Sequence, residues 1–375
     1  MKRTISLKLL SSSAQGRTLE KVQAMFTSAC NAVVRYASEN KCNNNVSLHH
    51  LCYYSVREHF STLGSQMVCQ SIRAVASSYK TLFSNRPRLK KEDWPKIAFG
   101  KHSSVHYDKR TYSLKGDVLS LFTLEGRIHV PLKIGGFQQK YLDIGTPKEA
   151  ELIQKKGHWY FNLVLDIPDP EFLASGDVLG IDMGENNLAA TSTGKLFGGG
   201  KLRHKRDKYL QLRRRLQGNG SKSAKQLLKK VSVRESRRVR HVNHEISKAL
   251  VAEALANGCS TIAMEKLTNI RKRIKAGKRM NSRLHRWAWA QLQEFVEYKA
   301  QAQGIRVIYV NPAYTSKTCS HCGNIGNRDR HRFSCPICGR LAHADLNAGQ
   351  NIASLGRTIV LSTGAVNRPD IAAFC

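Results

Sequence analysis

Residues 315–356 read TSKTCSHCGNIGNRDRHRFSCPICGRLAHADLNAGQNIASLG and contain two features with candidate chemical roles, one after the other. The first is a cysteine motif with the spacing C-x2-C, twelve residues, C-x2-C, formed by Cys319, Cys322, Cys335 and Cys338. Two such pairs complete a tetrahedral four-sulfur site, which favours zinc. Four protein ligands leave no open coordination position, so the spacing predicts one structural zinc ion per chain. Two disulfides or four unligated thiols are the alternatives.

The second feature is Asp345, which follows the cysteines at the start of a predicted helix. Its helical neighbours three and four residues on, Ala348 and Gly349, are both small. Aspartate is a favoured helix N-cap, and that is its ordinary role. A lone carboxylate beside a metal-stabilised module also suggests a nucleic-acid enzyme, and the rest of the chain can be searched for partner acids.

Asp182 is one such acid, in the segment VLGIDMG. The apolar pattern predicts a strand over 178–183, in which alternate residues share a face. Gly180 and Gly184 lie on the face of Asp182, and we interpret them as open space for a hydrated metal ion and a phosphate. A strand-end aspartate that caps a turn is the alternative.

Glu265 repeats this pattern at the end of a strand predicted over 261–265, with Ala263 on its face. Taken alone it fits an ordinary surface glutamate. Asp182, Glu265 and Asp345 are better explained together, as oxygen ligands for Mg²⁺. Two such ions activate a water molecule and stabilise the leaving oxygen in phosphodiester hydrolysis.

These motifs carry a family resemblance. The segments GIDMG, MEKL, TSKTCSHCG, FSCPICG and HADLNAGQNI resemble those of the TnpB (OrfB) proteins of insertion sequences, which are related to type V CRISPR effectors. The similarity covers about residues 176–356. The resemblance implies an RNase H-like (RuvC) nuclease domain over 176–315 and 343–363, with a zinc ribbon inserted at 316–342.

The same resemblance implies an activity and its partners. Asp182, Glu265 and Asp345 would be the catalytic acids and hold two Mg²⁺ ions. A guide RNA made from the transposon end would select double-stranded target DNA beside a short adjacent motif. The protein would work in the cytoplasm of a bacterium or archaeon, on the nucleoid when bound to DNA.

The first half of the chain alternates between strand and helix periodicity. Residues 2–10 have a period of two, and residues 17–85 have helical spacing around a polar segment at 43–45. Further strands are predicted at 118–124, 127–132 and 159–165, with turns at 125–126, 135–136 and 156–157. This periodicity predicts a β-rich module that helices interrupt. The resemblance implies that the module is a wedge-like β-barrel over 1–16 and 88–175, with a helical recognition insertion over 17–87.

The second half is predicted to mix helices and strands. The elements are a hairpin at 187–200, basic helices over 201–257, a helix over 283–303 and a strand over 305–310. The basic loop 269–283 is interpreted as a lid or strand-guiding loop. The tail 364–375 has no assignment.

The charge balance points to a polyanionic partner. Lys and Arg number 61 against 27 acids, a formal charge of +34, and nucleic acid is the partner that such a charge favours. No apolar run of 18 residues exists, so no membrane span is expected. Lys8 interrupts the apolar part of the N-terminus, which argues against a signal peptide, and unpatterned cysteines fit a reducing cytosol.

The basic excess is greatest over residues 201–240, which hold sixteen Lys or Arg and two acids. This segment is predicted to contact the backbone of a guide–target duplex; a solvated helical face is the alternative. The predicted contacts are Arg203, Lys205, Arg206, Arg213, Arg214, Arg215, Lys229, Lys230, Arg237 and Arg238.

Three other functions compete with an RNA-guided DNA endonuclease. A transposase that performs strand transfer would use the same fold. A non-cleaving, RNA-guided DNA-binding regulator would not need the three acids. A junction resolvase would need neither the helical insertion nor so much positive charge.

Overall fold

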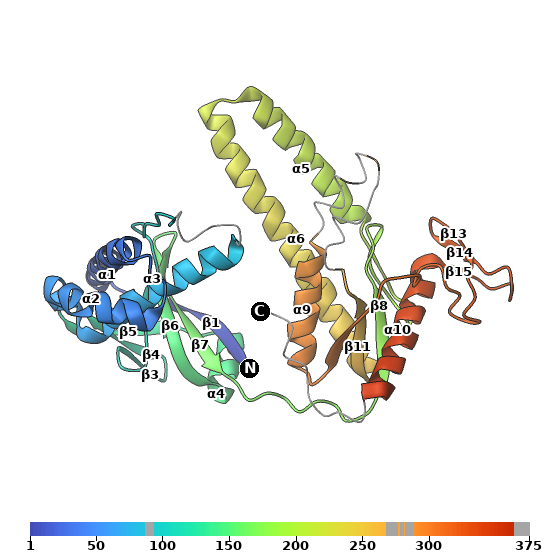
Figure 1. The fold of residues 1–375 in the computed structure, drawn as a ribbon, viewed down its shortest axis with the longest axis horizontal. Helices are drawn as coiled ribbons and strands as arrows, with labels where there is room; N and C mark the ends of the chain where they lie inside the picture. The colour runs from blue at the N-terminus through green and yellow to red at the C-terminus, as the bar shows by residue number, and fades with distance from the viewer. Residues whose placement is uncertain (87–93, 268–276, 278–280, 282–287, 364–375) are drawn as a thin grey trace. The chain divides into compact units, whose positions relative to one another are not determined.

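The computed structural model describes residues 1–86, 94–267, 277, 281 and 288–363. The chain divides into two compact units, Met1–Asp169 and Pro170–Cys375, which are described separately (Figure 1). The predicted loop 269–283 lies almost entirely outside the described residues, and the tail 364–375 lies wholly outside them. No helix in the described part of the chain has the length and apolar character needed to cross a membrane.

The first unit is built on a seven-stranded antiparallel sheet in the order β2-β6-β7-β1-β5-β4-β3. Its strands are β1 (Lys2–Leu9), β2 (Val105–Tyr107), β3 (Tyr112–Lys115), β4 (Val118–Thr123), β5 (Gly126–Lys133), β6 (Thr146–Lys155) and β7 (His158–Asp166). The Tyr107 hydroxyl on β2 donates to the Phe122 carbonyl on β4 at 3.2 Å. The Tyr112 hydroxyl on β3 donates to the Lys148 carbonyl on β6 at 2.7 Å. Both ends of the sheet therefore curl toward each other and form the predicted barrel, nearly closed, with the N-terminal strand in its middle.

Three helices are inserted between β1 and β2: α1 (Ser13–Glu39), α2 (Asn45–His59) and α3 (Ser65–Asn85), with a 3-10 turn at Ser61–Leu63. Ser12 begins α1 through a capping box with Gln15, and the Asn44 side chain caps α2. The polar segment predicted as a loop thus includes the cap of a helix. A second difference is α4 (Gly136–Ile144), where the sequence predicts only a turn.

The second unit contains a five-stranded sheet in the order β10-β9-β8-β11-β12. Its strands are β8 (Asp177–Asp182), β9 (Asn187–Thr191), β10 (Leu196–Gly198), β11 (Cys259–Glu265) and β12 (Arg306–Val310). Its helices are α5 (Gly200–Asn219), α6 (Lys222–Ala256), α9 (Trp289–Gln301) and α10 (Ala344–Thr363). β8, β11 and β12 are parallel, and β9 and β10 pair antiparallel at one side. The hairpin and helices lie where the sequence predicts them, with the described part of α9 beginning at Trp289.

Helices cover both faces of this sheet (Figure 1). Leu179 and Ile181 from β8 and Ile262 from β11 pack in one core with α6 and α9. Their alternating neighbours, including Val178 and Ala263, pack against α10 on the opposite face. The period-two pattern of each strand is thus satisfied by two layers of helices.

Candidate active site

The cysteines lie in a four-cysteine module, residues 316–343, that directly precedes α10. Its three short antiparallel strands are β13 (Asn327–Asp329), β14 (Arg332–Ser334) and β15 (Leu341–His343). Its small core consists of Cys319, Phe333 and Cys335, together with Ala344 at the start of α10. A module with so few buried residues needs a further source of stability.

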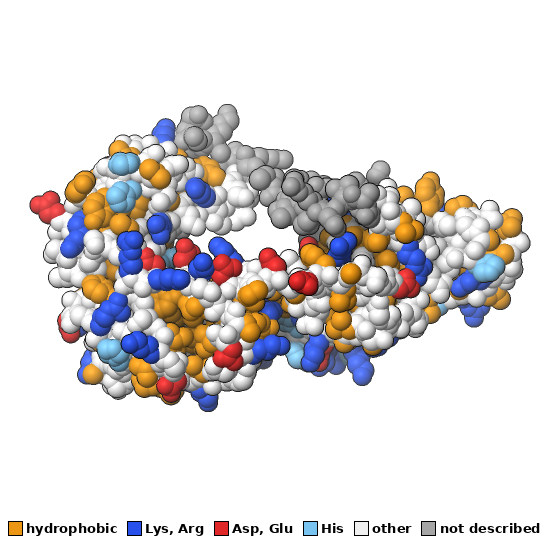
Figure 2. Space-filling view, turned by 90° about the horizontal axis from the view of Figure 1, so that it is seen from below, with side chains coloured by type: hydrophobic (Ala, Val, Ile, Leu, Met, Phe, Trp, Pro, Cys, Tyr) orange, Lys and Arg blue, Asp and Glu red, His pale blue; other side chains and the backbone are white. Residues whose placement is uncertain are grey.

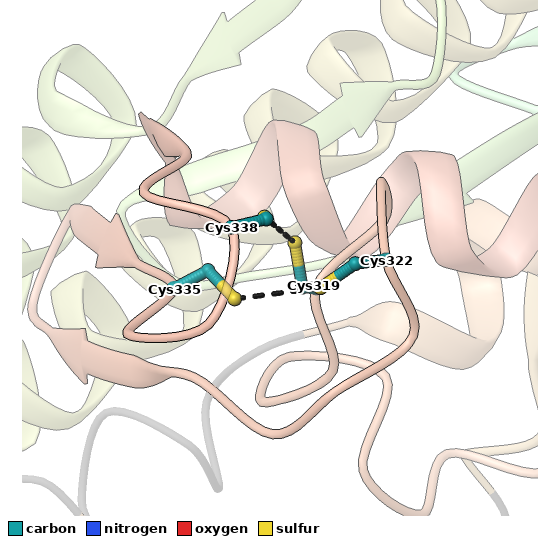
Figure 3. A group of neighbouring side chains, drawn as sticks. All are labelled: Cys319, Cys322, Cys335 and Cys338. Carbon is teal, nitrogen blue, oxygen red and sulfur yellow. Dashed lines mark hydrogen bonds between the residues drawn. The ribbon is translucent and has the colours of Figure 1, made fainter.

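The four predicted zinc ligands converge in one group (Figure 3). The Sγ atoms of Cys319 and Cys338 are 3.7 Å apart, and those of Cys322 and Cys335 are 3.5 Å apart. All four thiols are free, and their sulfur atoms lie within 4.8 Å of one another. A tetrahedron with zinc–sulfur bonds of about 2.3 Å has sulfur–sulfur edges of about 3.8 Å, so the geometry suits a zinc ion.

The turns around the cysteines also favour metal binding. Gly323 and Gly339, each the residue after a cysteine pair, have φ angles of 76° and 70°, which glycine adopts without steric cost. The backbone N–H of Asn324 and its side-chain amide, 3.5 Å from Sγ, lower the pKa of Cys322 to about 6. Because the thiolate is the metal ligand, this cysteine is prepared for coordination.

The three predicted acids lie at the carboxyl ends of neighbouring strands in the second unit's sheet. Asp182 ends β8 and Glu265 ends β11, and these strands are parallel neighbours. Since side chains alternate along a strand, both carboxylates leave the sheet on the face that α10 covers. Asp345 is the second residue of α10, and its side chain is buried.

The carboxylates are close enough to affect one another. Burial, followed by the negative charges of Glu265 and Asp345, raises the pKa of Asp182 to about 8. Burial also raises the pKa of Glu265, although the Thr315 hydroxyl donates to its Oε1 atom at 2.5 Å and opposes the shift. Acids that are at least partly buried and repel one another in this way favour a bound cation.

Arg328 and Asn187 were not singled out from the sequence. A guanidinium nitrogen of Arg328, on β13, donates to Oδ1 of Asp345 at 2.8 Å, and the Asn187 amide donates to Oδ2 at 2.8 Å. Arg328 also counteracts the raised pKa values of Asp182 and Glu265, so its guanidinium partly neutralises all three acids. It lies among several basic residues between the cysteine pairs, and the spacing does not indicate which of them faces the acids.

The small residues beside the acids have a different role from the predicted one. A β-carbon on Gly180 would lie 2.1 Å from the carbonyl oxygen of Gly349 in α10. A β-carbon on Gly356 would lie 2.8 Å from the Ala263 β-carbon. These residues allow α10 to approach the sheet closely, which brings Asp345 to the strand ends. The interpretation of Gly180 as open space for a hydrated metal ion is therefore wrong.

We expect Gly180→Ala to destabilise the second unit, because the added methyl group would push α10 away from the sheet. Overpacking of this kind costs about 1–3 kcal/mol. Thermal unfolding followed by circular dichroism will measure the loss. Gly218→Ala is the matched control, since its β-carbon meets nothing within 4 Å in helix α5 and should be neutral or stabilising. Equal unfolding temperatures for wild type and Gly180→Ala would contradict this close packing.

The predicted nucleic-acid contacts all lie on the hairpin of α5 and α6, and three have partners within it or beside it. Arg203 donates to Asn186 at 2.6 Å, and Arg213 and Arg206 lie 3.1 and 3.8 Å from the buried carboxylate of Glu235. Arg206 and Arg213 thus help to hold the two helices together. The exposed residues are Lys205, Arg214, Arg215, Lys229, Lys230, Arg237 and Arg238. Figure 2 shows Lys and Arg side chains distributed over the visible face rather than gathered in one patch.

Two family models match the chain over the segments that contain these features. One is described as "Probable transposase" (OrfB_IS605) and matches residues 163–271, which include Asp182 and Glu265. The other is "Cas12f1-like, TNB domain" and matches residues 289–352, which include the cysteines and Asp345. Both models therefore fall mainly on the second unit, the first of them beginning at residue 163, seven residues before the boundary.

Comparison with curated relatives identifies the protein family. The chain is 31% identical to "TnpB-like protein MJ0751" of Methanocaldococcus jannaschii over 64% of its own length and 91% of that protein. It therefore belongs to the family of TnpB-like proteins. It is 34% identical to "CRISPR-associated endodeoxyribonuclease Cas12f1" of Sulfoacidibacillus thermotolerans over 53% of its own length, and spans half the length of that relative. It is also 24% identical to "Putative RNA-guided DNA endonuclease InsQ" of Escherichia coli, over 79% of this chain and 75% of that protein.

Solved structures share the fold at low sequence identity. A Cas12f1–sgRNA–target DNA complex has a TM-score of 0.63 at 17% identity, with 91% of this chain and 83% of that chain covered. The mini-RNA-guided endonuclease CRISPR-Cas_phi3 has a TM-score of 0.57 at 12% identity, with 95% and 92% covered. The similarity to both structures thus extends over nearly the whole chain.

Proposed function

We propose that this protein is an RNA-guided DNA endonuclease whose second unit is a RuvC-like nuclease domain with an inserted zinc ribbon. The observation that carries this proposal is the meeting of Asp182, Glu265 and Asp345 at one sheet edge, each on a different element. Family membership supports it, because relatives of this chain carry the names of DNA endonucleases.

The three acids would hold Mg²⁺ ions through their carboxylate oxygens. When bound, two such ions lower the pKa of a water molecule and stabilise the oxygen that leaves a phosphodiester. Arg328 supplies positive charge to the same carboxylates and is placed to meet a phosphate that approaches them. Asn187 and Thr315 hold Asp345 and Glu265 in fixed orientations. The four-cysteine module would bind zinc for structural reasons and hold Arg328 against the acids.

We infer that sequence selection comes from a guide RNA and not from the protein's own side chains. The exposed basic residues of α5 and α6 suit phosphate contacts, which position a duplex without reading its sequence. Base pairing to a guide then supplies the specificity. The structurally similar Cas12f1 complex contains an sgRNA and a target DNA, and this chain's net charge of +34 fits such partners.

A transposase is the second candidate, because one matching family model is described as a transposase. The two functions would use the same three acids but give different DNA products. Strand transfer joins donor DNA to target DNA, whereas hydrolysis leaves free ends. Gel analysis of labelled donor and target DNA with Mg²⁺ distinguishes them. A non-cleaving regulator fits less well, since all three acids are present and lie close enough to affect one another.

We expect the purified protein to carry RNA and to lose specific DNA cleavage when that RNA is removed. Cleavage of a matched duplex with Mg²⁺ will be compared before ribonuclease treatment, after it, and after RNA is added back. Sequencing the copurified RNA provides the matched duplex. Specific cutting that persists without RNA would replace the guided nuclease with one that reads DNA itself.

A further inference from the structure

A second group of metal-ligand side chains lies beside the proposed nuclease site. It consists of His331, His343 and Asp345, whose ligand atoms lie within 4.8 Å of one another. The two histidine rings stack with centroids 5.6 Å apart and an interplanar angle of 24°. Neither histidine is among the site residues that the sequence predicts.

The backbone fixes the two histidines next to each other. His343 ends β15 and pairs in register with Arg332, the residue after His331. The backbone N–H of Ala344 donates to the carbonyl of His331 at 2.8 Å. This hydrogen bond continues the pairing of β14 with β15 up to His331. Asp345 follows one residue later, and the site is therefore built on strands and the first turn of a helix.

We propose that His331, His343 and Asp345 bind a divalent transition-metal ion, at a site separate from the four cysteines and selective against Mg²⁺. Two imidazoles and one carboxylate suit Zn²⁺, Ni²⁺ or Fe²⁺, whereas Mg²⁺ prefers oxygen ligands alone. Three protein ligands leave coordination positions for water, so the ion exchanges with solution. This separates it from a zinc ion in the four-cysteine module, whose four thiolates would leave no coordination position for water.

Asp345 can take part without losing its present partners. An ionised carboxylate offers about four acceptor positions. Arg328 uses Oδ1 and Asn187 uses Oδ2, each through one hydrogen bond at 2.8 Å. Acceptor positions thus remain for a metal ion, and the ligand nitrogens of both histidines lie within 4.8 Å of this carboxylate.

Sharing Asp345 gives the site a regulatory consequence, which rests on the proposed nuclease function. An ion held by the histidines adds positive charge next to Asp345 and occupies part of a carboxylate that the catalytic Mg²⁺ ions need. Low concentrations of a transition metal will therefore inhibit cleavage in the presence of excess Mg²⁺.

Calorimetric titration of the zinc-loaded chain with Ni²⁺, without Mg²⁺ or nucleic acid, tests the site itself. Wild type will bind one Ni²⁺ ion, with zinc content unchanged by elemental analysis. His331→Ala and His343→Ala will each bind Ni²⁺ at least tenfold more weakly, since loss of an outer-shell partner alone costs about 10–100-fold. His321→Ala is the matched control, because this exposed histidine of the same module lies outside the group and should leave binding unchanged. Equal Ni²⁺ affinity in wild type and both variants, or no binding by wild type, overturns the proposal.

Cleavage provides an independent readout. With Mg²⁺ present, added Zn²⁺ will inhibit wild type, and His331→Ala will cut DNA at the wild-type rate but resist the inhibition. Equal inhibition of both proteins would contradict regulation through this site. If no protein cleaves DNA under any condition, the proposed nuclease function fails, and the Ni²⁺ titration alone decides the metal site.

Discussion

Replacing Asp182, Glu265 or Asp345 with alanine is expected to abolish DNA cleavage and to leave RNA-guided DNA binding largely intact. Each side chain would supply oxygen ligands to the same pair of Mg²⁺ ions. Metal stabilisation of the transition state is worth several kcal/mol, and each 1.36 kcal/mol is a factor of ten in rate. We therefore expect single substitutions to slow cleavage by about 10³-fold or more. Single-turnover cleavage and gel-shift binding on the same guide and target will separate the two effects.

Two comparisons make this test specific. Glu294→Ala removes an exposed acid of α9 outside the site and should cut normally. Paired substitutions among the three acids should cost little more than single ones, because residues that act as a unit do not contribute additively. If Glu265→Ala cut at the wild-type rate, the second acid would have been assigned wrongly. If all three variants cut normally, the nuclease site would lie elsewhere.

Loss of zinc is expected to unfold the four-cysteine module. It should also slow cleavage about as much as alanine substitution of one of the three acids. The module's buried core is too small to hold β13–β15 together without the ion. Unfolding would remove Arg328 from Asp345, although the sheet that carries Asp182 and Glu265 would remain. Elemental analysis should find one zinc per wild-type chain and much less in Cys335→Ser. Limited proteolysis should cut that variant within residues 316–343.

Cys42→Ser is the control for this experiment, because Cys42 is a free thiol outside the metal group. It should retain zinc, protease resistance and cleavage. Wild-type protein that contains no zinc would refute the metal assignment. A module that stays protease-resistant in Cys335→Ser would show that its small core suffices for folding.

Much of the second unit was predictable because its sequence signals are local. Short apolar runs placed Asp182 and Glu265 at strand ends, and the cysteine spacing identified four thiols that converge and could hold a metal ion. The role predicted for the glycine beside Asp182 was nevertheless wrong. Gly180 is small because α10 packs against it, and that contact joins segments about 170 residues apart, which no single-segment pattern reveals.

The missed features depend on three-dimensional contacts. Arg328 reaches Asp345 only because the four-cysteine module folds back onto the start of α10. Arg206 and Arg213 look like nucleic-acid contacts in the sequence, yet Glu235 binds both across the helical hairpin. The sequence offered one sign of this pairing: Glu235 is one of only two acids among the sixteen basic residues of 201–240. The helix α4 was missed because it is only nine residues long and buries none of its side chains fully.

Exchange of the guide RNA measures the proposed mechanism most directly. The protein will be reconstituted with two RNAs that differ only in the segment complementary to DNA, and each complex will be offered both matched duplexes with Mg²⁺. An RNA-guided nuclease will cut only the duplex that matches its RNA, and Asp182→Ala will cut neither. Cutting at the same DNA sequence with both RNAs would contradict guidance by RNA.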